Sequence, residues 1–597
     1  RKIKNSNSDS DEYFKLILKY GKLIQSFPNH LSVHAGGILI TKKPISYYTA
    51  TFMPPKGYQT VQFDMNIAES VGIHKFDILS QTGLPKIKHA IEIVRENQPD
   101  AEVKDIEDYK QFTRDPAINS LLKTGNCIGV FYVESPAMRV LMTKLRTQDY
   151  LNLVAASSII RPGVSNGGMK NEFILRHRNP ERCKQAHPVM LEILHDTYGV
   201  MVYQEDVLKV AHKFAGLSLA EADILRRGMR GKVRSKGEFV NIEQKFKDNC
   251  IQKGYTNQLT EEIWGQVKAF AGYAFAKGHS ASYAVESYQS LYLKKYFPLE
   301  FMTAVLNNGG GFYNVQTYIN EIKKCGGIVA PPCINNSDHP NCIKGKTVYL
   351  GFGMIKSLED RTVQRLLSVR QTTGFLTSLD DFVDRVKISL EQLMLLVRLD
   401  AFRFTGLDKH QIAWQAQFKL KATKQDYHSP VLFKTQQKSY ALPQFKSNPL
   451  IDAYDQMELL GYPLISRFDL LADAMSSHLL ASDIPAYDKK RIVIYGNLVT
   501  AKGTPTNDKR LMHFGTFLDR EGNVFDTVHF PQVSEKYPIV SKGIYIITGR
   551  VVEEMEYYSI IAEKVEFQAI LPDPRQVDEG HKGNASLETK QLPVWGE

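Results

Sequence analysis

The stretch FAGYAFAKGHSASYA, from Phe270 to Ala284, sets small residues around one lysine and one histidine, without the apolar stripe of an ordinary core helix. Small side chains leave room for a polyanion to approach the backbone, while Lys277 supplies positive charge and His279 a hydrogen-bond donor. The pattern therefore predicts a surface that handles phosphate. The same residues leave open an alternative, which is a tightly packed helix pair with one surface lysine.

A second basic element lies upstream of this stretch. Ser218 and Glu221 form an S-x-x-E capping box, which predicts a helix that runs towards Met229. Four cations crowd the end of this helix: Arg226, Arg227, Arg230 and Lys232. Guanidinium groups at this density suit bidentate contacts with phosphate oxygens. The alternative is a solvated basic helix end that the helix dipole favours.

Long motifs in register give the chain a resemblance to a known family. Residues 199–232 and 270–302 closely resemble the fingers of the bacterial DNA polymerase III alpha subunit, the family C replicative polymerase. The resemblance continues, in family order, through HAGGILI, HKFDILSQTGL, GNCIGVFYVESPAMRVLMTKL and ASSIIRPG. It covers about nine tenths of the chain, and several long motifs are far more specific than one short pattern.

A chain of 597 residues is too long for one hydrophobic core, so several domains are expected. The resemblance implies a multidomain α/β and α fold with part of a polymerase-beta-like palm, helical fingers, a tandem helix-hairpin-helix region and a C-terminal OB-fold β-barrel. The expected limits are 1–85 for the end of the thumb and the second palm segment, 86–330 for the fingers, 331–418 for the helix-hairpin-helix region, 419–489 for a connection, 490–568 for the OB-fold and 569–597 for a polar tail.

Composition agrees with a polyanionic partner. The net charge of +11 and the pI of about 9.0 favour nucleic acid, with a solvated basic surface as the alternative. The chain has no long apolar run and no signal-peptide pattern, so a soluble, cytoplasmic protein without a membrane partner is expected. The six cysteines form no C-x-x-C pair, and the irregular spacing of Cys325, Cys333, His339 and Cys342 favours reduced thiols over a zinc site.

Phosphoryl transfer by polymerases needs two divalent ions held by carboxylates. Asp77 lies in a short apolar run that predicts a strand, and from these residues alone an exposed strand-end aspartate is the alternative. The resemblance implies that Asp77 is the third metal-binding carboxylate, that Lys75 faces the triphosphate and that Mg²⁺ is the cofactor. It further implies nucleotide contacts from Arg161, Arg226, Arg227, Lys277 and His279.

The resemblance also indicates what this chain lacks. The family carries an aspartate pair on a palm strand, whereas the early acidic run here, Asp9 to Glu12, lies in a polar segment. We therefore expect the C-terminal portion of a shorter-type member, inactive by itself. Its complete polypeptide would be a DNA-directed DNA polymerase that extends primer-template DNA with deoxynucleoside triphosphates, in replication or in lesion bypass. The alternative is a non-catalytic module that binds DNA and the sliding clamp.

Two hairpin tips depart from the family pattern. Helix-hairpin-helix motifs hold DNA phosphates with backbone amides at glycine-rich tips. Here residues 357–359 read Ser-Leu-Glu and residues 399–401 read Leu-Asp-Ala. Because glycine is missing and because Glu359 and Asp400 repel phosphate, we expect weaker duplex binding than in the family, or a purely structural role.

Two further regions hold candidate binding residues. The segment SPVLF, residues 429–433, occupies the place of the family's sliding-clamp peptide, and Leu432 and Phe433 fit its anchors although the usual glutamine is absent. A linker clipped to the surface is the alternative. Residues 490–568 alternate like five short strands, which predicts an OB-fold. Its candidate contacts with a template strand are Lys509, Arg510, Phe514, Phe517 and Phe530, unless the aromatic residues belong to the core. Other replisome subunits are expected partners.

Overall fold

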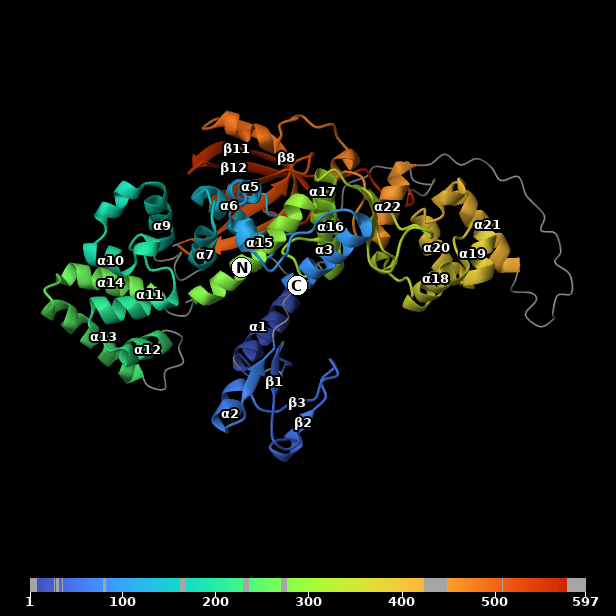
Figure 1. Cartoon of the computed structure of the whole chain (residues 1–597). Coiled ribbons are helices and arrows are strands. Elements are labelled where there is room, and N and C mark those ends of the chain that lie inside the picture. The colour runs from blue at the N-terminus through green and yellow to red at the C-terminus, as the bar shows by residue number, and fades with distance from the viewer. Residues whose placement is uncertain are drawn as a thin grey trace. The chain divides into compact units, whose positions relative to one another are not determined.

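The computed structural model divides into two compact units, Arg1–Thr82 and Gly83–Glu597. Figure 1 shows their helices and strands. The structure describes residues 8–25, 27, 32–34, 36–78, 82–161, 168–228, 236–269, 276–422, 448–506 and 508–576. Within these ranges, no helix combines the length and the hydropathy that a membrane span requires.

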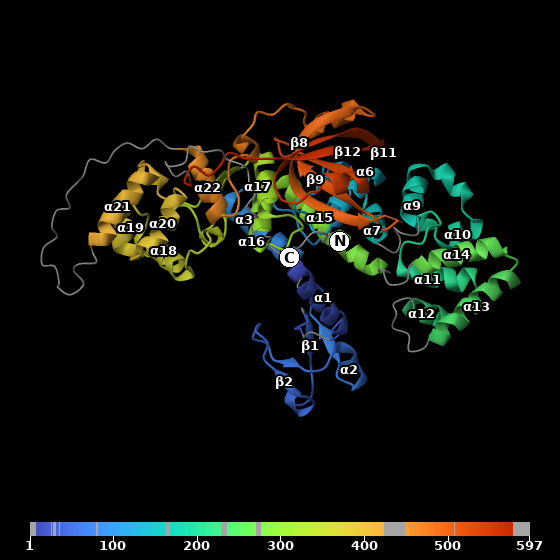
Figure 2. The same ribbon diagram turned by 180° about the vertical axis from the view of Figure 1, so that it is seen from behind.

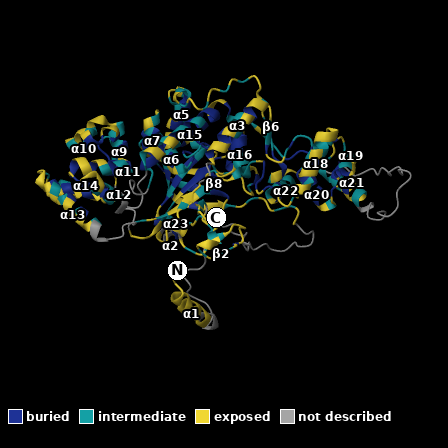
Figure 3. Cartoon of the chain, turned by 60° about the horizontal axis from the view of Figure 1, so that its bottom comes forward, coloured by how far each residue is buried: buried dark blue, intermediate teal, exposed yellow. Residues whose placement is uncertain are grey.

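The smaller unit consists of short strands and helices. An antiparallel pair joins β1 (Gly37–Leu39) to β4 (Lys75–Asp77), and a second pair joins β2 (Thr51–Phe52) to β3 (Thr60–Val61). Its helices are α1 (Ser8–Leu23), α2 (Met65–Ser70) and the 3-10 turn Ile45–Tyr47. The described side chains of α1 are exposed, as the yellow ribbon in Figure 3 shows. The strand predicted around Asp77 is confirmed as β4.

The larger unit begins with a long run of helices. These are α3 (Gly83–Asn97), α4 (Lys110–Thr113), α5 (Pro116–Thr124), α6 (Pro136–Leu145), α7 (Tyr150–Ile159), α9 (Met169–Arg178), α10 (Pro188–Ile193), α11 (Gln204–Lys209), α12 (Leu219–Gly228), α13 (Lys236–Gln252), α14 (Asn257–Ala269), α15 (Lys277–Tyr296), α16 (Pro298–Asn308) and α17 (Val315–Lys324). Shorter 3-10 segments occupy Pro180–Gln185 and His195–Thr197, and one π-helical turn spans Val210–Phe214.

Local signals in the sequence start and stop these helices. Asp115 caps α5 by accepting from two backbone amides of the first turn, and Pro116 occupies the first helical position. Gly125 ends the helix with a φ of 68°, a conformation that glycine adopts without steric cost. The capping box of α12 is confirmed, because the Ser218 amide donates to the Glu221 carboxylate at 2.9 Å and the Glu221 amide donates to the Ser218 hydroxyl at 3.3 Å.

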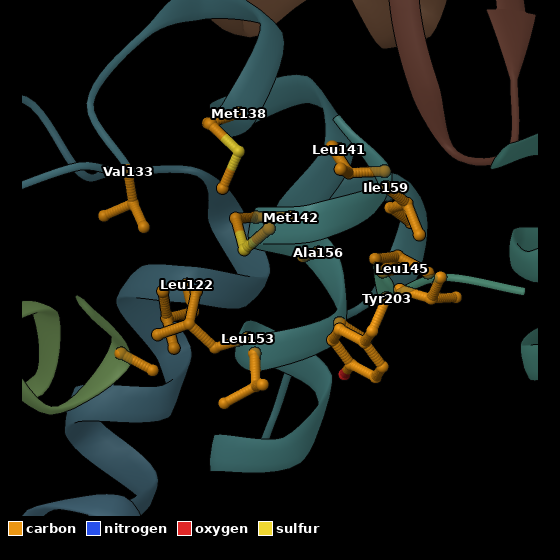
Figure 4. Packing of buried hydrophobic residues seen from close by; sticks show 14 of the residues in the cluster. Leu122, Val133, Met138, Leu141, Met142, Leu145, Leu153, Ala156, Ile159 and Tyr203 are labelled. Carbon is orange, nitrogen blue, oxygen red and sulfur yellow. The ribbon is translucent and has the colours of Figure 1, made fainter. Parts of the chain in front are cut away.

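One hydrophobic core joins α3, α5, α6, α7, α15 and α16. Figure 4 shows part of it, with side chains from three consecutive helices: Leu122, Met138, Leu141, Met142, Leu145, Leu153, Ala156 and Ile159. Helix α15 packs on α7 through small residues, and the hydroxyl oxygens of Ser158 and Ser280 lie 2.6 Å apart in this buried contact. The small residues that follow Lys277 therefore serve helix packing on their buried side.

A second core lies downstream of a small sheet. The sheet has the order β5 (Ile328–Ala330), β7 (Thr347–Tyr349), β6 (Cys342–Lys344). The helices around the core are α18 (Asp360–Thr373), α19 (Leu379–Val386), α20 (Leu390–Arg398), α21 (Lys409–Ala422) and α22 (Pro449–Leu459). Figure 1 shows α18 to α21 grouped together. Short 3-10 turns lie at Phe352–Met354, Arg403–Thr405, Arg467–Leu470 and Ala481–Tyr487.

Five strands close a barrel near the end of the described chain. They are β8 (Arg491–Pro505), β9 (Leu511–Leu518), β10 (Val524–His529), β11 (Ile544–Glu554) and β12 (Tyr557–Gln568), in the order β10-β12-β11-β8-β9. Figure 2 shows this barrel from behind. The pair β10-β12 is parallel, and α23 (Pro531–Lys536) connects β10 to β11. This is the OB-fold topology that strand alternation predicted, and the multidomain fold class is confirmed.

The hairpin between β11 and β12 rests on the helical core. Glu554 pairs with Lys144 at 2.6 Å, and Glu556 pairs with Arg146 and, at 2.9 Å, with Arg178. Met555, between the two glutamates, packs against the same core. This acidic hairpin tip is therefore used for contacts inside the unit, and its charge is balanced by the helices beneath it.

A buried carboxyl on α15 creates a pH dependence of stability. Glu286 is 7% exposed, and its Oε1 atom has no hydrogen-bond partner among the described residues. Burial raises its pKa from 4.5 to about 7, although the positive charge of Lys86 opposes the shift. Because the folded-state pKa is raised, the stability from this group is fully present below its unfolded pKa and is lost as the pH rises through about 7.

We expect Glu286→Gln to stabilise the protein at pH 8 by up to about 3 kcal/mol, since each pKa unit corresponds to about 1.4 kcal/mol. At pH 5 the difference from wild type should fall below about 1 kcal/mol, because the native carboxyl is then neutral. Thermal unfolding at both pH values measures the effect, with Glu262→Gln on the exposed face of α14 as the matched control. An equal difference at both pH values would contradict the buried, proton-binding state.

Candidate functional site

Two of the predicted nucleotide-binding residues lie in the first turn of α15. The ammonium of Lys277 is 3.3 Å from the Asp196 carboxylate and 5.3 Å from the ring centre of Tyr203. The backbone amide of Lys277 donates to Glu205 at 3.0 Å. His279 is exposed one half-turn further along. The first turn of α15 thus presents an accessible cation that is held by an acidic neighbour.

Tyr132 and Tyr283 connect His279 to Arg161. The Arg161 Nη2 atom donates to the Tyr132 hydroxyl at 2.8 Å, and that hydroxyl donates to the Ser157 carbonyl at 3.1 Å. The rings of Tyr132 and Tyr283 are 4.9 Å apart, and those of Tyr283 and His279 are 4.4 Å apart. We call Tyr132, His279 and Tyr283 the aromatic cluster. Arg161 contacts this cluster through Tyr132. Lys277 precedes His279 and Tyr283 in α15.

The sequence prediction missed both tyrosines. Tyr132 has a φ of 66°, in the left-handed region that is costly for a residue with a bulky side chain. Strain of this kind concentrates at functional sites. The two hydrogen bonds of its hydroxyl hold it there, and burial raises its pKa, so the group is a neutral phenol at neutral pH. The available signal was its position in GVFYVES, inside a segment that resembles the family.

Of the four cations predicted near the end of α12, Arg226 is the one whose side chain the structure describes. Its Nε and Nη2 atoms donate to the Asp223 carboxylate at 2.9 and 2.7 Å, and this pair lies on a helix separate from α15. The side chain of Arg227 lies outside the described residues, as do Arg230 and Lys232. Arg226 therefore has the same type of acidic neighbour as Lys277.

Asp77 ends β4 in the smaller unit, opposite Gly37 of β1. The Lys75 ammonium donates to both of its carboxylate oxygens, at 2.7 and 2.8 Å, and His34 Nδ1 lies 3.8 Å away. The hydrogen bond from Lys75 lowers the pKa of Asp77, so the carboxylate is ionised at neutral pH. Its side chain is 45% exposed, which leaves its oxygen atoms accessible.

The chemistry of Asp77 fits one hard oxygen ligand of a divalent ion. It does not make a complete metal site, because the described residues contain no group of three or more histidine, cysteine, aspartate or glutamate side chains suited to a metal. The six cysteines, which include the irregular group near His339, are free thiols.

Both hairpin tips use left-handed residues in place of glycine. Ser357 has a φ of 65° and Asp400 a φ of 55°. The Glu359 amide donates to the Gln392 side chain at 2.8 Å, and the amides of Asp400 and Ala401 donate to carbonyl groups of α20 at 2.9 and 3.0 Å. These tip amides are engaged by protein acceptors, which favours the structural role over phosphate binding.

The barrel aromatics divide into two kinds. Phe514 and Phe530 are 46% and 45% exposed, so each offers part of a ring to solvent. Phe517 requires a correction, because its side chain is fully buried and packs with Phe525 inside the barrel, at 5.7 Å between ring centres. A ring enclosed on both faces cannot stack on a base.

The basic candidates of the barrel lie in the loop between β8 and β9. Lys509 adopts a φ of 62° in this turn, and the Arg510 Nε atom donates to Asp508 at 2.6 Å. Arg510 is therefore already balanced by an adjacent carboxylate. The clamp-peptide candidates Leu432 and Phe433 lie outside the described residues.

Comparison with known proteins matches three family models to this chain. The bacterial DNA polymerase III alpha subunit finger domain matches residues 83–254, and the bacterial DNA polymerase III alpha NTPase domain matches residues 1–80. The helix-hairpin-helix motif matches residues 326–412.

The similar proteins carry two names, DNA polymerase III subunit alpha and error-prone DNA polymerase. DNA polymerase III subunit alpha of Borreliella burgdorferi is 28% identical over 93% of this chain and 50% of its own length, and that of Aquifex aeolicus is 28% identical over 93% and 47%. The error-prone DNA polymerase of Vibrio campbellii is 31% identical over 66% of this chain and 39% of its own length. The chain thus spans about half the length of these relatives, or less.

Helical fingers, a helix-hairpin-helix region and a closed five-stranded barrel in one chain define a polymerase subunit of the C-family class. Relatives named DNA polymerase III subunit alpha match most of its length. The chain belongs to the bacterial DNA polymerase III alpha family.

Proposed function

We propose that this chain is part of a DNA-directed DNA polymerase that adds deoxynucleotides to a primer 3′-hydroxyl. The observation that carries the proposal is the grouping of Arg161, Lys277 and the aromatic cluster near the start of α15. These residues lie in the segment that resembles the family's fingers, and that resemblance implies nucleotide binding. Cations suit the triphosphate, and the aromatic faces suit a base or a sugar.

Acidic side chains pair with two of the cations that are proposed to bind the triphosphate. Lys277 pairs with Asp196 and Arg226 with Asp223, and all four groups are partly exposed. Exposed ion pairs contribute little free energy, typically below about 1 kcal/mol. A triphosphate, with its higher charge density, therefore replaces these carboxylates at small cost.

In the smaller unit, Asp77 is proposed as one metal ligand, with Lys75 released towards the triphosphate. A bound Mg²⁺ would neutralise charge on the reacting phosphates. The carboxylate of Asp77 is ionised and accessible, and the Lys75 ammonium balances its charge. Both side chains change partner in this proposal, and the backbone of β4 stays in place.

The proposed partners are primer-template DNA, deoxynucleoside triphosphates, other replisome subunits and, through Leu432 and Phe433, a sliding clamp. Replication and lesion bypass are both compatible with the names of the relatives. The domain limits expected from the sequence, with the fingers at 86–330 and the OB-fold at 490–568, are part of the proposal.

We expect Arg226→Ala to raise the nucleotide KM of the complete polypeptide, or to lower its kcat, by about tenfold, because a charge-assisted phosphate contact is lost. Steady-state primer extension measures this effect. Arg182→Ala is the matched control, because Arg182 also binds a carboxylate, that of Glu172, on the surface. Unchanged kinetics for Arg226→Ala would remove this residue from the site. A loss of DNA binding with an unchanged KM would assign Arg226 to DNA contacts instead of nucleotide contacts.

A further inference from the structure

A polar groove lies where α17 meets the barrel. It has a volume of about 250 Å³ and is bounded by α17, by residues 465–468 and by the turn between β9 and β10. Gly522 of this turn approaches Asn320 of α17, with 4.0 Å from an ideal Cβ position to the Asn320 Cβ. We call this feature the Arg467 groove. None of the candidate binding residues named from the sequence lines it.

Arg467 is the unusual member of this groove. Its Nε atom is buried without a hydrogen-bond partner, and no carboxylate among the described residues pairs with it. Burial lowers its pKa, and no carboxylate of the described residues offsets this effect. By contrast, Arg398 binds Asp455 at 2.8 Å, and Arg403 donates to the Pro332 carbonyl at 2.8 Å. A buried Nε–H without an acceptor costs free energy, and an anion in the groove would supply that acceptor.

Cations outnumber acidic residues in the groove. Lys323 and Lys324 of α17 and Arg520 of the barrel turn line it together with Arg467. The acidic residues there are Asp519 and Glu521. Asp519 is already engaged, because its carboxylate accepts backbone amides of its own turn at 2.8 and 2.9 Å and that of Ala481 at 2.8 Å. Four cations thus face one available carboxylate.

The size of the groove restricts the anion. A volume of about 250 Å³ admits a phosphate with its sugar, and it is smaller than the pockets of roughly 300–1,000 Å³ that enclose larger ligands. Arginine matches phosphate oxygens with its planar fork, and lysines beside it track a strand of successive phosphates. We propose that the Arg467 groove binds a backbone phosphate of a nucleic acid strand that passes between α17 and the barrel. The choice of a nucleic acid rests on the proposed function.

The site differs from the barrel candidates named from sequence. Lys509 and Arg510 lie in the β8–β9 loop, whereas the groove uses the β9–β10 turn and a helix from the preceding segment. Two parts of the larger unit therefore contribute to one phosphate contact. Binding of a strand here would link the barrel to α17.

The test measures binding of a short fluorescent oligothymidylate to the 597-residue chain by anisotropy, without nucleotides. Arg467→Met, which keeps the apolar stem, should weaken binding about tenfold and reduce the salt dependence by about one phosphate contact. Arg491→Met is the control, since it removes the same charge from the exposed barrel surface, and it should change binding less than about twofold. Equal affinities for the two variants would overturn the proposal.

Two further readouts separate the sources of phosphate and a structural role. Inorganic phosphate at the concentration of oligonucleotide phosphate should fail to displace the strand, and full displacement would mean that the groove takes free phosphate. Arg467→Met should melt at a higher temperature than wild type when no ligand is present, because a buried charge is removed. A lower melting temperature with unchanged oligonucleotide binding would make Arg467 structural and overturn the proposal.

Lys324→Glu, on the exposed face of α17, gives a second variant with the same expected loss of binding. Because no chemistry is measured, a negative result here leaves the extension experiments to decide the polymerase function.

Discussion

Replacing Asp77 with asparagine is expected to reduce metal-dependent primer extension by the complete polypeptide more than about 100-fold. Removing a group that only supports a metal ligand lowers metal affinity or activity 10- to 100-fold, and removing a ligand should lower activity further. Asparagine keeps the size of the side chain but removes the negative charge, so a divalent ion and the Lys75 ammonium both lose their partner at β4.

The measurement is primer extension at matched protein folding, together with DNA binding in the absence of nucleotides. Asp100→Asn, in the exposed turn after α3, is the matched control and should leave extension unchanged. Retained DNA binding with lost extension would support a metal role for Asp77. Undiminished extension would show that Asp77 only pairs with Lys75, and the palm assignment would then have to be abandoned.

Replacing Glu321 with leucine is expected to lower the free energy of unfolding of the larger unit by about 3–5 kcal/mol. Glu321 of α17 and Lys294 of α15 form an ion pair at 2.6 Å, and both side chains are 3% exposed. Burial opposes ionisation of Glu321, but the Lys294 charge overrides it and lowers the pKa of the carboxyl. Without Glu321, Lys294 keeps one acceptor, the Ile128 carbonyl at 2.5 Å, and its charge stays buried.

Denaturant unfolding of the larger unit measures this effect. The double variant Lys294→Met/Glu321→Leu should recover most of the loss, because two apolar side chains leave no buried charge. Glu261→Leu is the surface control, since it breaks an exposed pair with Lys247 and should cost less than about 1 kcal/mol. A double variant as unstable as the single one would mean that cavity formation, and not the uncompensated charge, dominates.

This ion pair also bears on the Arg467 groove. Glu321 anchors α17 to α15, and the next turn of α17 supplies Lys323 and Lys324 to the groove wall. Loss of the pair should therefore weaken oligonucleotide binding at the groove as well as stability. The two proposals are linked through the position of one helix.

Much of the fold was predictable because its signals are local. The S-x-x-E box of α12 and the alternation of residues 490–568 each act within a few residues, and both were confirmed. The strand around Asp77 was predicted in the same way. Long motifs in family order identified the family, because the order of residues along the chain can be compared without knowledge of the fold.

The errors and omissions involve contacts that only the folded chain makes. Phe517 reads like an exposed strand aromatic until the barrel closes and its ring meets Phe525. Tyr132 was missed because its left-handed backbone, with a φ of 66°, and the contact of its hydroxyl with Arg161 appear only in the folded chain. No periodic pattern in the sequence predicts either contact, because each forms only when the tertiary structure forms.

The sequence by itself determined the family, the order of the helical and barrel segments and the identity of several cations, because caps, alternation and long motifs are read along the chain. Only the tertiary structure decided which groups meet. It joined Tyr132, His279 and Tyr283 beside Arg161, and it left the Nε atom of Arg467 buried without a hydrogen-bond partner. The physical reason is that burial and charge pairing depend on neighbours from other segments of the chain, which local pattern does not specify.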